Sequence, residues 1–350
     1  MIIFRYVLIF ALVTFSSCKI TESKSSVESI KINTVDLVSF EDAKKIKDEI
    51  FMQSNFFIKE ILIGDVLYLK ANDLNHVDAY HLQDSSRTKY QFSERPIKIN
   101  EFSVGSDRVF LLSSQSKLLL VFDKEGKFIK EIPLKIGRYE IEGDMGESLF
   151  QWNEGQQIFY LGLTKSKRYK GVELVGIFDL SGQLKSTFGD FTKDNDQAIP
   201  GFILANHGIR HQLTKNAFYI LKKESSQLYQ FDFQGSLKQK VKLDFKVIPN
   251  KEKVLVAGKQ VIKDQVMDFY VDEHSKELVF TYFTNTGSYF GERKPDPYLA
   301  YKKFKSDTIY YDKVDFFNLL DYQDHVISTI PFNPDSEAKY LTSYGLDLRN

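Results

Sequence analysis

The stretch VFDKEGKFIKEI at residues 121–132 decides the fold, because two short alternating segments flank a tight turn in it. Asp123 suits the opening of a β-turn, and Gly126 suits a position of positive φ at its end. The same pattern, Phe-Asp-x-x-Gly followed by an alternating segment, returns at residues 177–185 and 230–238, after 56 and 53 residues. The sequence therefore predicts a β-hairpin that repeats at a near-constant interval.

Further strands are expected before each hairpin, over residues 108–112, 157–163 and 217–221. Weaker copies of the hairpin occur at residues 80–84 and 320–324, and a sixth copy is expected within residues 240–310. There, residues 270–274 are either the hidden copy or the end of an inner strand that turns into residues 277–283. Repeats of three or four antiparallel strands are typical of propeller blades. We predict an all-β fold, a six-bladed β-propeller of four-stranded antiparallel blades; a β-sandwich with coincidental turns is the alternative.

Residues 122–132, with residues 109–112 and 118–121 before them, resemble the outer strands of TolB-like and NHL-like six-bladed propellers, especially those found as lipoproteins of the bacterial cell envelope. The resemblance spans residues 55–330 as architecture and implies no particular activity. Members often carry a Gly-Arg-Gly-Pro-Gly-Glu type loop after the outer strand. Only a trace of that loop remains in this chain, at residues 137–140.

The composition is that of a folded protein with balanced charge. The 350 residues include 47 Lys and Arg against 47 Asp and Glu, so the formal net charge is zero. A nucleic-acid partner is not expected, because no basic excess is available to neutralise phosphates. The 30 Phe and 19 Tyr residues favour strands over helices.

The N-terminus predicts export and lipidation. Arg5 precedes a short apolar stretch, which is too short to span a bilayer. Ser16 and Ser17 lead into Cys18, the only cysteine of the chain, as in the lipobox of bacterial lipoproteins. This resemblance implies that residues 1–17 are a signal peptide and that Cys18 is diacylated and becomes the first residue of the mature protein. An ordinary signal peptide with a chance cysteine is the alternative.

The segments after Cys18 follow from their composition. Residues 18–29 are polar and Ser-rich after the cysteine and are expected to form a flexible tether, with the propeller domain in residues 30–350. A short amphipathic helix is predicted over residues 39–51. Residues 335–346 are either a similar tail or a final strand that pairs near residues 30–35 and closes the ring. Lys19 after the cysteine is compatible with sorting to the outer membrane of a Gram-negative bacterium.

The sequence contains few candidate ligands for a metal. His207 and His211 stand four residues apart, but no third ligand is placed beside them, and solvated loop histidines are the favoured interpretation. Asp194 and Asp196 belong to an oxygen-rich loop that lacks the spacing of a calcium-binding loop. No catalytic motif is present, and no cofactor is predicted.

Aromatic and basic residues interleave between residues 287 and 311, a combination that protein interfaces and sugar-binding surfaces favour. The alternative is that these aromatics face inward as ordinary core strands. The long loop at residues 190–211 and the turn at 138–140 are further places for binding. The predicted binding residues are Arg138, Tyr139, Asp194, Asp196, His207, Arg210, His211, Tyr289, Arg293, Tyr298 and Tyr301.

These observations predict a lipid-anchored propeller of the cell envelope that binds a protein or a glycan without chemistry of its own. Its partners are then a membrane, through the N-terminal lipid, and an envelope protein or glycan. The alternative is a metal-dependent propeller hydrolase, lactonase-like or glycan-cleaving, with calcium or another divalent metal at the central channel. A third possibility is a structural subunit that docks an outer-membrane transporter or a secretion machine.

Overall fold

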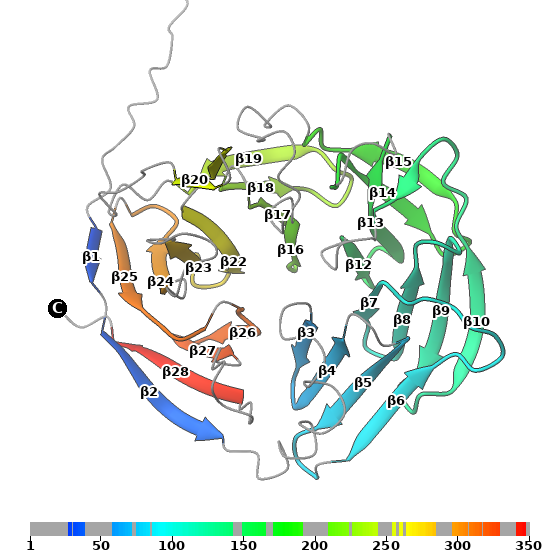
Figure 1. Cartoon of the computed structure of the whole chain (residues 1–350), viewed down its shortest axis with the longest axis horizontal. Coiled ribbons are helices and arrows are strands. Elements are labelled where there is room, and N and C mark those ends of the chain that lie inside the picture. The colour runs from blue at the N-terminus through cyan, green and yellow to red at the C-terminus, as the bar shows by residue number, and fades with distance from the viewer. Residues whose placement is uncertain are drawn as a thin grey trace, which may run out of the picture.

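The structure is a ring of antiparallel β-sheets around a central axis (Figure 1). It is a computed structural model. It describes residues 27–29, 31–38, 58–71, 75–84, 86–142, 149–165, 171–191, 209–223, 226–243, 254–256, 259–261, 264–284, 296–306, 308–316, 318–329 and 341–347. Within this part of the chain, no helix has the length and apolar character needed to cross a membrane.

The first four blades follow one another along the chain, and the first strand of each lies nearest the axis (Figure 1). Blade 1 consists of β3 (Ile58–Ile63), β4 (Val66–Ala71), β5 (His76–His81) and β6 (Arg87–Gln91). Blade 2 consists of β7 (Glu101–Val104), β8 (Arg108–Ser113), β9 (Leu118–Asp123) and β10 (Phe128–Pro133). Blade 3 consists of β12 (Phe150–Asn153), β13 (Ile158–Thr164), β14 (Leu174–Asp179) and β15 (Leu184–Phe188), with β11 (Glu140–Ile141) also on β13. Blade 4 consists of β16 (Ile209–Leu213), β17 (Phe218–Lys222), β18 (Gln227–Phe231) and β19 (Leu237–Lys242).

The last two blades include strands from the N-terminal part of the chain. Blade 5 consists of β22 (Asp264–Asp272), β23 (Glu277–Thr284), β24 (Asp296–Lys303) and β25 (Ile309–Lys313), and β1 (Val27–Ser29) adds to β25 in parallel. Blade 6 consists of β26 (Asp321–Gln323), β27 (Val326–Thr329), β28 (Leu341–Asp347) and, outermost, β2 (Lys31–Val38). A separate hairpin of β20 (Val254–Val256) and β21 (Lys259–Val261) precedes blade 5. The predicted six-bladed fold of four-stranded blades is confirmed.

The ring is closed by β2, which pairs antiparallel with β28. Of the two interpretations of the C-terminal residues, the final strand is therefore confirmed. β1 lies inside residues 18–29, the predicted tether, so strand pairing already starts at Val27. The helix predicted over residues 39–51 lies outside the described residues.

The repeated hairpin of the sequence is the turn between the third and fourth strands of a blade. In blade 3, the Asp179 carboxylate accepts hydrogen bonds from the backbone N–H of Ser181 and Gln183, and in blade 4 Asp232 does the same for Gln234 and Ser236. The turn glycines have the expected positive φ, +84° at Gly126, +77° at Gly182 and +87° at Gly235.

Each of these glycines also touches the blade before it. A Cβ at Gly182 would lie 2.1 Å from the carbonyl oxygen of Pro133 in β10, and one at Gly235 would lie 2.4 Å from the ring of Phe188 in β15. The motif thus fixes the turn and the approach of successive blades at once, because glycine is the residue that allows both.

The two weaker repeats lie at different turns of their blades. Residues 80–84 are the turn between β5 and β6, equivalent to the clear copies. Residues 320–324 lie instead in the first hairpin of blade 6, between β26 and β27, so their assignment as an equivalent copy was wrong. Residues 270–274 end the inner strand β22, which is the second of the two interpretations.

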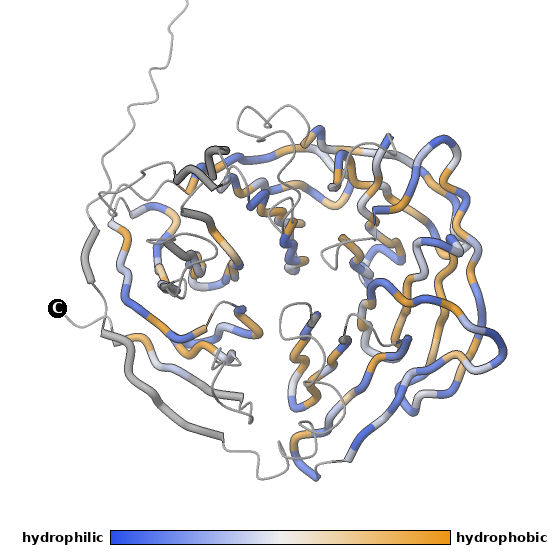
Figure 2. The backbone as a smooth tube through the Cα atoms, in the orientation of Figure 1, coloured by the Kyte–Doolittle hydropathy of each residue, from blue (hydrophilic) through white to orange (hydrophobic). Residues whose placement is uncertain are grey.

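The hydrophobic core lies between blades. Five clusters of buried side chains fill the five interfaces from blades 1 and 2 to blades 5 and 6. In one of them the rings of Tyr160 and Phe218 stack with centroids 4.5 Å apart. Figure 2 shows the apolar stretches along the strands and hydrophilic residues at many of the turns. Inner and middle strands such as β9 have continuous buried apolar runs because each sheet buries both of its faces against its neighbours.

The ring has two faces, which we name by their connections. On the hairpin face, the first strand of each blade turns into the second and the third into the fourth, as at residues 105–107 and 124–127 of blade 2. On the loop face, the first strand of each blade begins and the second turns into the third, as at residues 114–117. The two faces therefore present different parts of the sequence.

Candidate functional site at the propeller axis

Charged and polar side chains from four blades meet near the axis, where the inner strands begin on the loop face. We call Lys59, Glu101, Arg210, His211 and Asp268 the axial cluster; they come from β3, β7, β16 and β22. These strands lie closest to the centre of the ring in Figure 1. The cluster is the main candidate site because it brings together charged and hydrogen-bonding side chains from positions far apart in the sequence.

Lys59 and Glu101 link blades 1 and 2. The Lys59 Nζ donates to Glu101 Oε2 at 2.5 Å and to the Phe102 carbonyl oxygen at 3.0 Å. Glu101 is buried, with 2% of its side chain exposed, whereas 17% of Lys59 is exposed. The ammonium also lies 5.4 Å from the centre of the Phe102 ring. A charge-assisted hydrogen bond of this kind is about twice as strong as a neutral one.

Arg210 and Asp268 link blades 4 and 5. The Arg210 Nε lies 3.9 Å from Asp268 Oδ1, and the backbone N–H groups of Phe269 and Leu319 donate to the two carboxylate oxygens at 3.0 and 2.9 Å. Burial raises the pKa of Asp268, although Arg210 and the N–H of Leu319 act in the opposite direction. The same two blades are joined by Gln212, which donates to the Val271 carbonyl and accepts from the Val271 N–H.

His211 supplies the only imidazole of the axial cluster. Burial, together with the positive charge of Lys59, lowers the pKa of His211 to about 3, against a smaller opposing effect of its hydrogen bond to the Phe150 backbone. The ring is therefore neutral at pH 7. It presents a hydrogen-bonding nitrogen and no charge at the axis.

The axial cluster as a whole is polar but balanced, since each cation faces a carboxylate of the next blade. Among the described residues, no group of three or more His, Cys, Asp or Glu side chains is arranged to hold a metal ion. The arrangement suits hydrogen bonding to a polar, uncharged ligand.

The structure describes six of the eleven predicted binding residues. Arg210 and His211 lie in the axial cluster. Arg138 and Tyr139 follow β10, with the guanidinium carbon 5.5 Å from the ring centre, and the hydrogen bond from Arg138 lowers the pKa of Tyr139. Tyr298 and Tyr301 belong to β24. Asp194, Asp196, His207, Tyr289 and Arg293 lie outside the described residues.

The aromatics of β24 take part in packing. Tyr298 stacks on Tyr282 with ring centres 5.3 Å apart. Tyr301 is buried, with 1% exposed, and its hydroxyl donates to Glu277 Oε1 at 2.6 Å. At these two positions the aromatics face inward as core strands, the alternative that the sequence left open.

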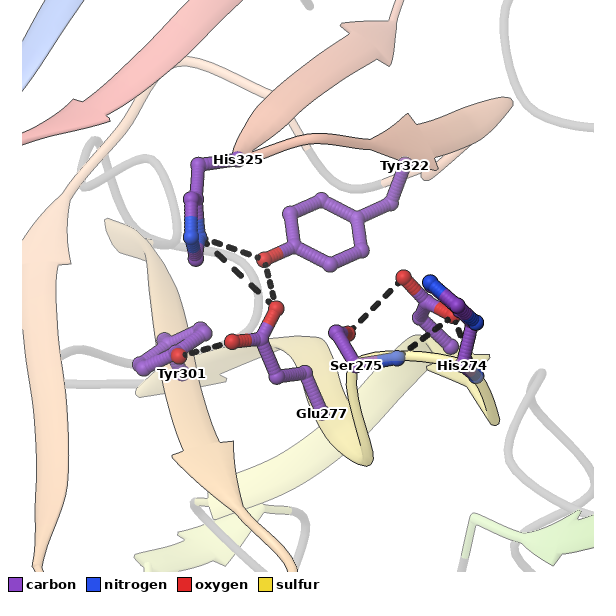
Figure 3. A network of polar contacts seen from close by, with 7 residues as sticks. His274, Ser275, Glu277, Tyr301, Tyr322 and His325 are labelled. Carbon is purple, nitrogen blue, oxygen red and sulfur yellow. Dashed lines mark hydrogen bonds and ion pairs between the residues drawn. The ribbon is translucent and has the colours of Figure 1, made fainter.

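A second polar group, the Glu277 cluster, lies between blades 5 and 6 (Figure 3). It consists of Glu277, Tyr301, Tyr322 and His325. Tyr322 donates to Glu277 Oε2 at 2.8 Å, and His325 Nδ1 lies 3.1 Å from the Tyr322 hydroxyl and 3.7 Å from the same carboxylate oxygen. Burial acts to raise the pKa of Glu277, but the hydroxyls of Tyr301 and Tyr322 outweigh it, and the pKa is lowered.

We predict that Tyr322→Phe lowers the free energy of unfolding by about 1.5–3 kcal/mol at pH 7, because a buried carboxylate loses a donor. The pKa of Glu277 is depressed in the folded state, so this stabilisation is present above the ordinary glutamate pKa and disappears as the pH falls through the folded value. Chemical denaturation from pH 7 to pH 3 measures it. Tyr344→Phe is the matched control, because its hydroxyl donates to Asp315 in an exposed pair; an equal effect of both variants would contradict the prediction.

Two of the five axial residues, Arg210 and His211, are among the binding residues predicted from the sequence, whereas Lys59, Glu101 and Asp268 are not. A usable signal was present. Lys59 and Glu101 are 42 residues apart, and Arg210 and Asp268 are 58 apart, so opposite charges recur at about the blade interval. Such a pair within short apolar segments indicates a contact between the inner strands of successive blades.

Comparison with known proteins supports the fold. No protein-family model matches the chain, and no curated protein matches it. Among solved structures, a member of the DUF4221 family from Bacteroides vulgatus is similar, with a TM-score of 0.60 and 10% identity over 91% of this chain and 99% of that chain. A chain described as an exported protein of Bacteroides fragilis has a TM-score of 0.54 and 10% identity over 93% and 99% of the two chains.

Proposed function

We propose that this protein is a non-catalytic binding module of the bacterial cell envelope, anchored to a membrane through Cys18. The observation that carries the proposal is the axial cluster, which gathers paired charges and a neutral imidazole from blades 1, 2, 4 and 5. The ligand class that fits is a polar, uncharged one, such as a glycan or an extended segment of an envelope protein.

Partial exposure of the cations supports a surface role on the loop face. Arg210 is 28% exposed and Lys59 is 17% exposed, so both reach solvent; of their carboxylate partners, Glu101 is buried and Asp268 is 14% exposed. A ligand with hydroxyl or amide groups exchanges hydrogen bonds with these side chains without separating the ion pairs. Arg138 and Tyr139 follow the outer strand β10 near the same face and offer a half-buried aromatic ring with an exposed cation beside it, a combination that sugar-binding surfaces favour.

The character of His211 favours binding over acid–base catalysis. An effective general base has a pKa near the working pH. A pKa of about 3 makes the His211 imidazole a weak base, so it accepts a hydrogen bond more readily than a proton. The competing proposal, a metal-dependent hydrolase, needs a set of ligands that the described residues do not supply.

A thermal-shift screen of the purified protein against envelope glycans, with calcium and zinc in parallel, tests the proposal. A ligand at about 100 times its Kd adds about 2.7 kcal/mol of stability. We expect a glycan to raise the midpoint for the wild type and not for Arg210→Ala. A stoichiometric divalent metal that stabilises the fold and supports hydrolysis would overturn the binding proposal in favour of the enzyme.

The anchoring part of the proposal predicts that Cys18→Ala abolishes lipidation. Two or more acyl chains hold a protein on a membrane, and removal of the thiol removes the attachment atom. In a Gram-negative host, fatty-acid labelling and membrane fractionation should show loss of label and release from the membrane fraction. Ser17→Ala is the matched control and keeps a small residue before the cysteine. A labelled Cys18→Ala protein, or an unlabelled wild type, would contradict the prediction.

A further inference from the structure

The exposed large hydrophobic residues gather on the hairpin face. Within the described part of the chain, five such side chains are exposed by 36–53%: Ile63, Ile129, Leu180, Leu237 and Phe304. Ile63 precedes the β3–β4 turn, and the other four lie in or beside the third turns of blades 2 to 5. Single exposed apolar residues are ordinary. Their collection on one face of a disc, one in each of five successive blades, gives that face a different character from the loop face.

One corner of blade 5 combines exposed lysines with an exposed aromatic ring on this face. We call it the lysine corner; it consists of Lys276, Lys303, Phe304 and Lys305. The backbone N–H of Phe304 donates to the Lys276 carbonyl at 2.9 Å, and this bond brings the two turns of the blade together. All four side chains are exposed, and among the described residues none of the three lysines forms an ion pair. The nearby carboxylates are engaged elsewhere, Asp272 by its own turn and Glu273 by Asn216.

The chain from the lipidation site joins the fold at this corner. β1 runs parallel to β25, and Val27 pairs with Ile309, the first residue of β25 after the turn that holds the lysine corner. The start of β1 therefore lies at the hairpin face. Val27 follows Cys18 by nine residues, so a fully extended chain separates the two by at most about 30 Å.

We propose that the hairpin face rests on the membrane surface and that its lysine corner contacts anionic lipid headgroups. This inference rests on the proposed lipid anchor at Cys18. The short connection keeps the corner at high effective concentration near the bilayer, so a contact too weak to recruit a free protein suffices for an anchored one. Each lysine beside an anionic surface raises surface occupancy by roughly fivefold. Phe304 supplies an apolar ring of the kind that interfacial segments bury at the boundary of headgroups and acyl chains.

This orientation turns the loop face, with the axial cluster, away from the lipid. The ligand site of the proposed function then points into the surrounding compartment. One face of an anchored disc meets the membrane and the other meets the surrounding compartment. The distribution of lysines and apolar residues indicates that the hairpin face is the one on the membrane.

The test uses the full-length mature lipoprotein reconstituted into vesicles of phosphatidylethanolamine and phosphatidylglycerol in equal parts, with and without brominated acyl chains. Phe304→Trp places a fluorophore at the lysine corner, and Gln115→Trp places one at an exposed position of the loop face. The unsubstituted protein corrects for Trp152. We expect brominated lipid to quench the tryptophan at position 304 at least about threefold more than that at position 115.

A second variant tests the charge. Neutralising Lys276, Lys303 and Lys305 to glutamine in the Phe304→Trp protein should reduce the quenching at least about fivefold in these vesicles. Exposed lysines contribute little to folding, so the variant keeps its structure. In vesicles of phosphatidylcholine alone the lysine substitutions should have no effect.

The outcomes separate the two proposals. Protein that floats with the vesicles but shows equal quenching at positions 304 and 115 overturns the docking face and leaves the anchor intact. Such a result would also follow if the corner docks a partner protein. Protein that does not float with the vesicles overturns both the anchor and the contact. Quenching that is unchanged by the three glutamines overturns the role of the anionic headgroups.

Discussion

Gly182→Ala is expected to lower the free energy of unfolding by about 2–5 kcal/mol. Gly182 has φ of +77°, a conformation that an alanine adopts only with strain, and its Cβ would lie 2.1 Å from the Pro133 carbonyl oxygen of the neighbouring blade. Because the obstructing atom is backbone, relief requires blades 2 and 3 to move apart. Equilibrium denaturation, followed by circular dichroism and tryptophan fluorescence, measures the loss.

Gly137→Ala separates the two causes. Gly137 also has a positive φ, +61°, but nothing lies within 4 Å of a Cβ built there. This variant should lose only the conformational part, about 1–2 kcal/mol. If both variants lose the same stability, the contact between the turn and the preceding blade makes no contribution, and our account of the repeat motif is wrong.

Glu101→Ala is expected to lower the free energy of unfolding by about 3–5 kcal/mol, since it leaves the Lys59 ammonium in the axial cluster without its carboxylate. Glu131→Ala is the control: Arg95 and Glu131 form an ion pair on the surface, with 54% and 30% of the side chains exposed, and its loss should change stability by about 1 kcal/mol or less. Thermal and urea denaturation give both values under the same conditions.

The double variant Lys59→Met with Glu101→Leu should recover most of the stability lost in Glu101→Ala. Replacement of both charges by apolar side chains removes the uncompensated ammonium, and buried pairs replaced in this way are often neutral in stability. If the double variant is as unstable as the single one, packing around Glu101 and not the ion pair accounts for the loss. Glycan binding in the double variant then reports whether the axial charges also serve recognition.

The fold was predictable because its signal is local and repeated. Asp123, Asp179 and Asp232 each open a turn that a glycine ends, and this chemistry depends on residues within a single hairpin. The assignment of residues 320–324 failed for the same reason: the first and third turns of a blade both place an acidic residue after an aromatic strand, and only the strand order distinguishes them.

The candidate site was less predictable because it is assembled across blades. The spacing of His211 from His207 marks it in the sequence, yet its pKa is set by burial and by Lys59 and the Phe150 backbone, which are more than fifty residues away in sequence. Tyr301 belongs to a run of aromatics that predicts a binding surface, but its hydroxyl donates a hydrogen bond to the buried Glu277 carboxylate. A local sequence pattern locates a strand. The partner of each polar side chain, however, lies in a neighbouring blade and depends on the order of the blades in the ring.

The strand β2 also sets an order on the folding of the chain. Lys31 pairs with Asp347, 316 residues later, so the outermost strand of blade 6 has no partner until residues up to Asp347 are available. Blades 1 to 4 are each built from neighbouring residues and are free to form early, whereas joining the ends is a slow step of long sequence separation. Under the proposed export through the N-terminal signal, this segment is the first to cross the membrane and the last to be fixed. The ring then closes only after residues up to Asp347 have crossed.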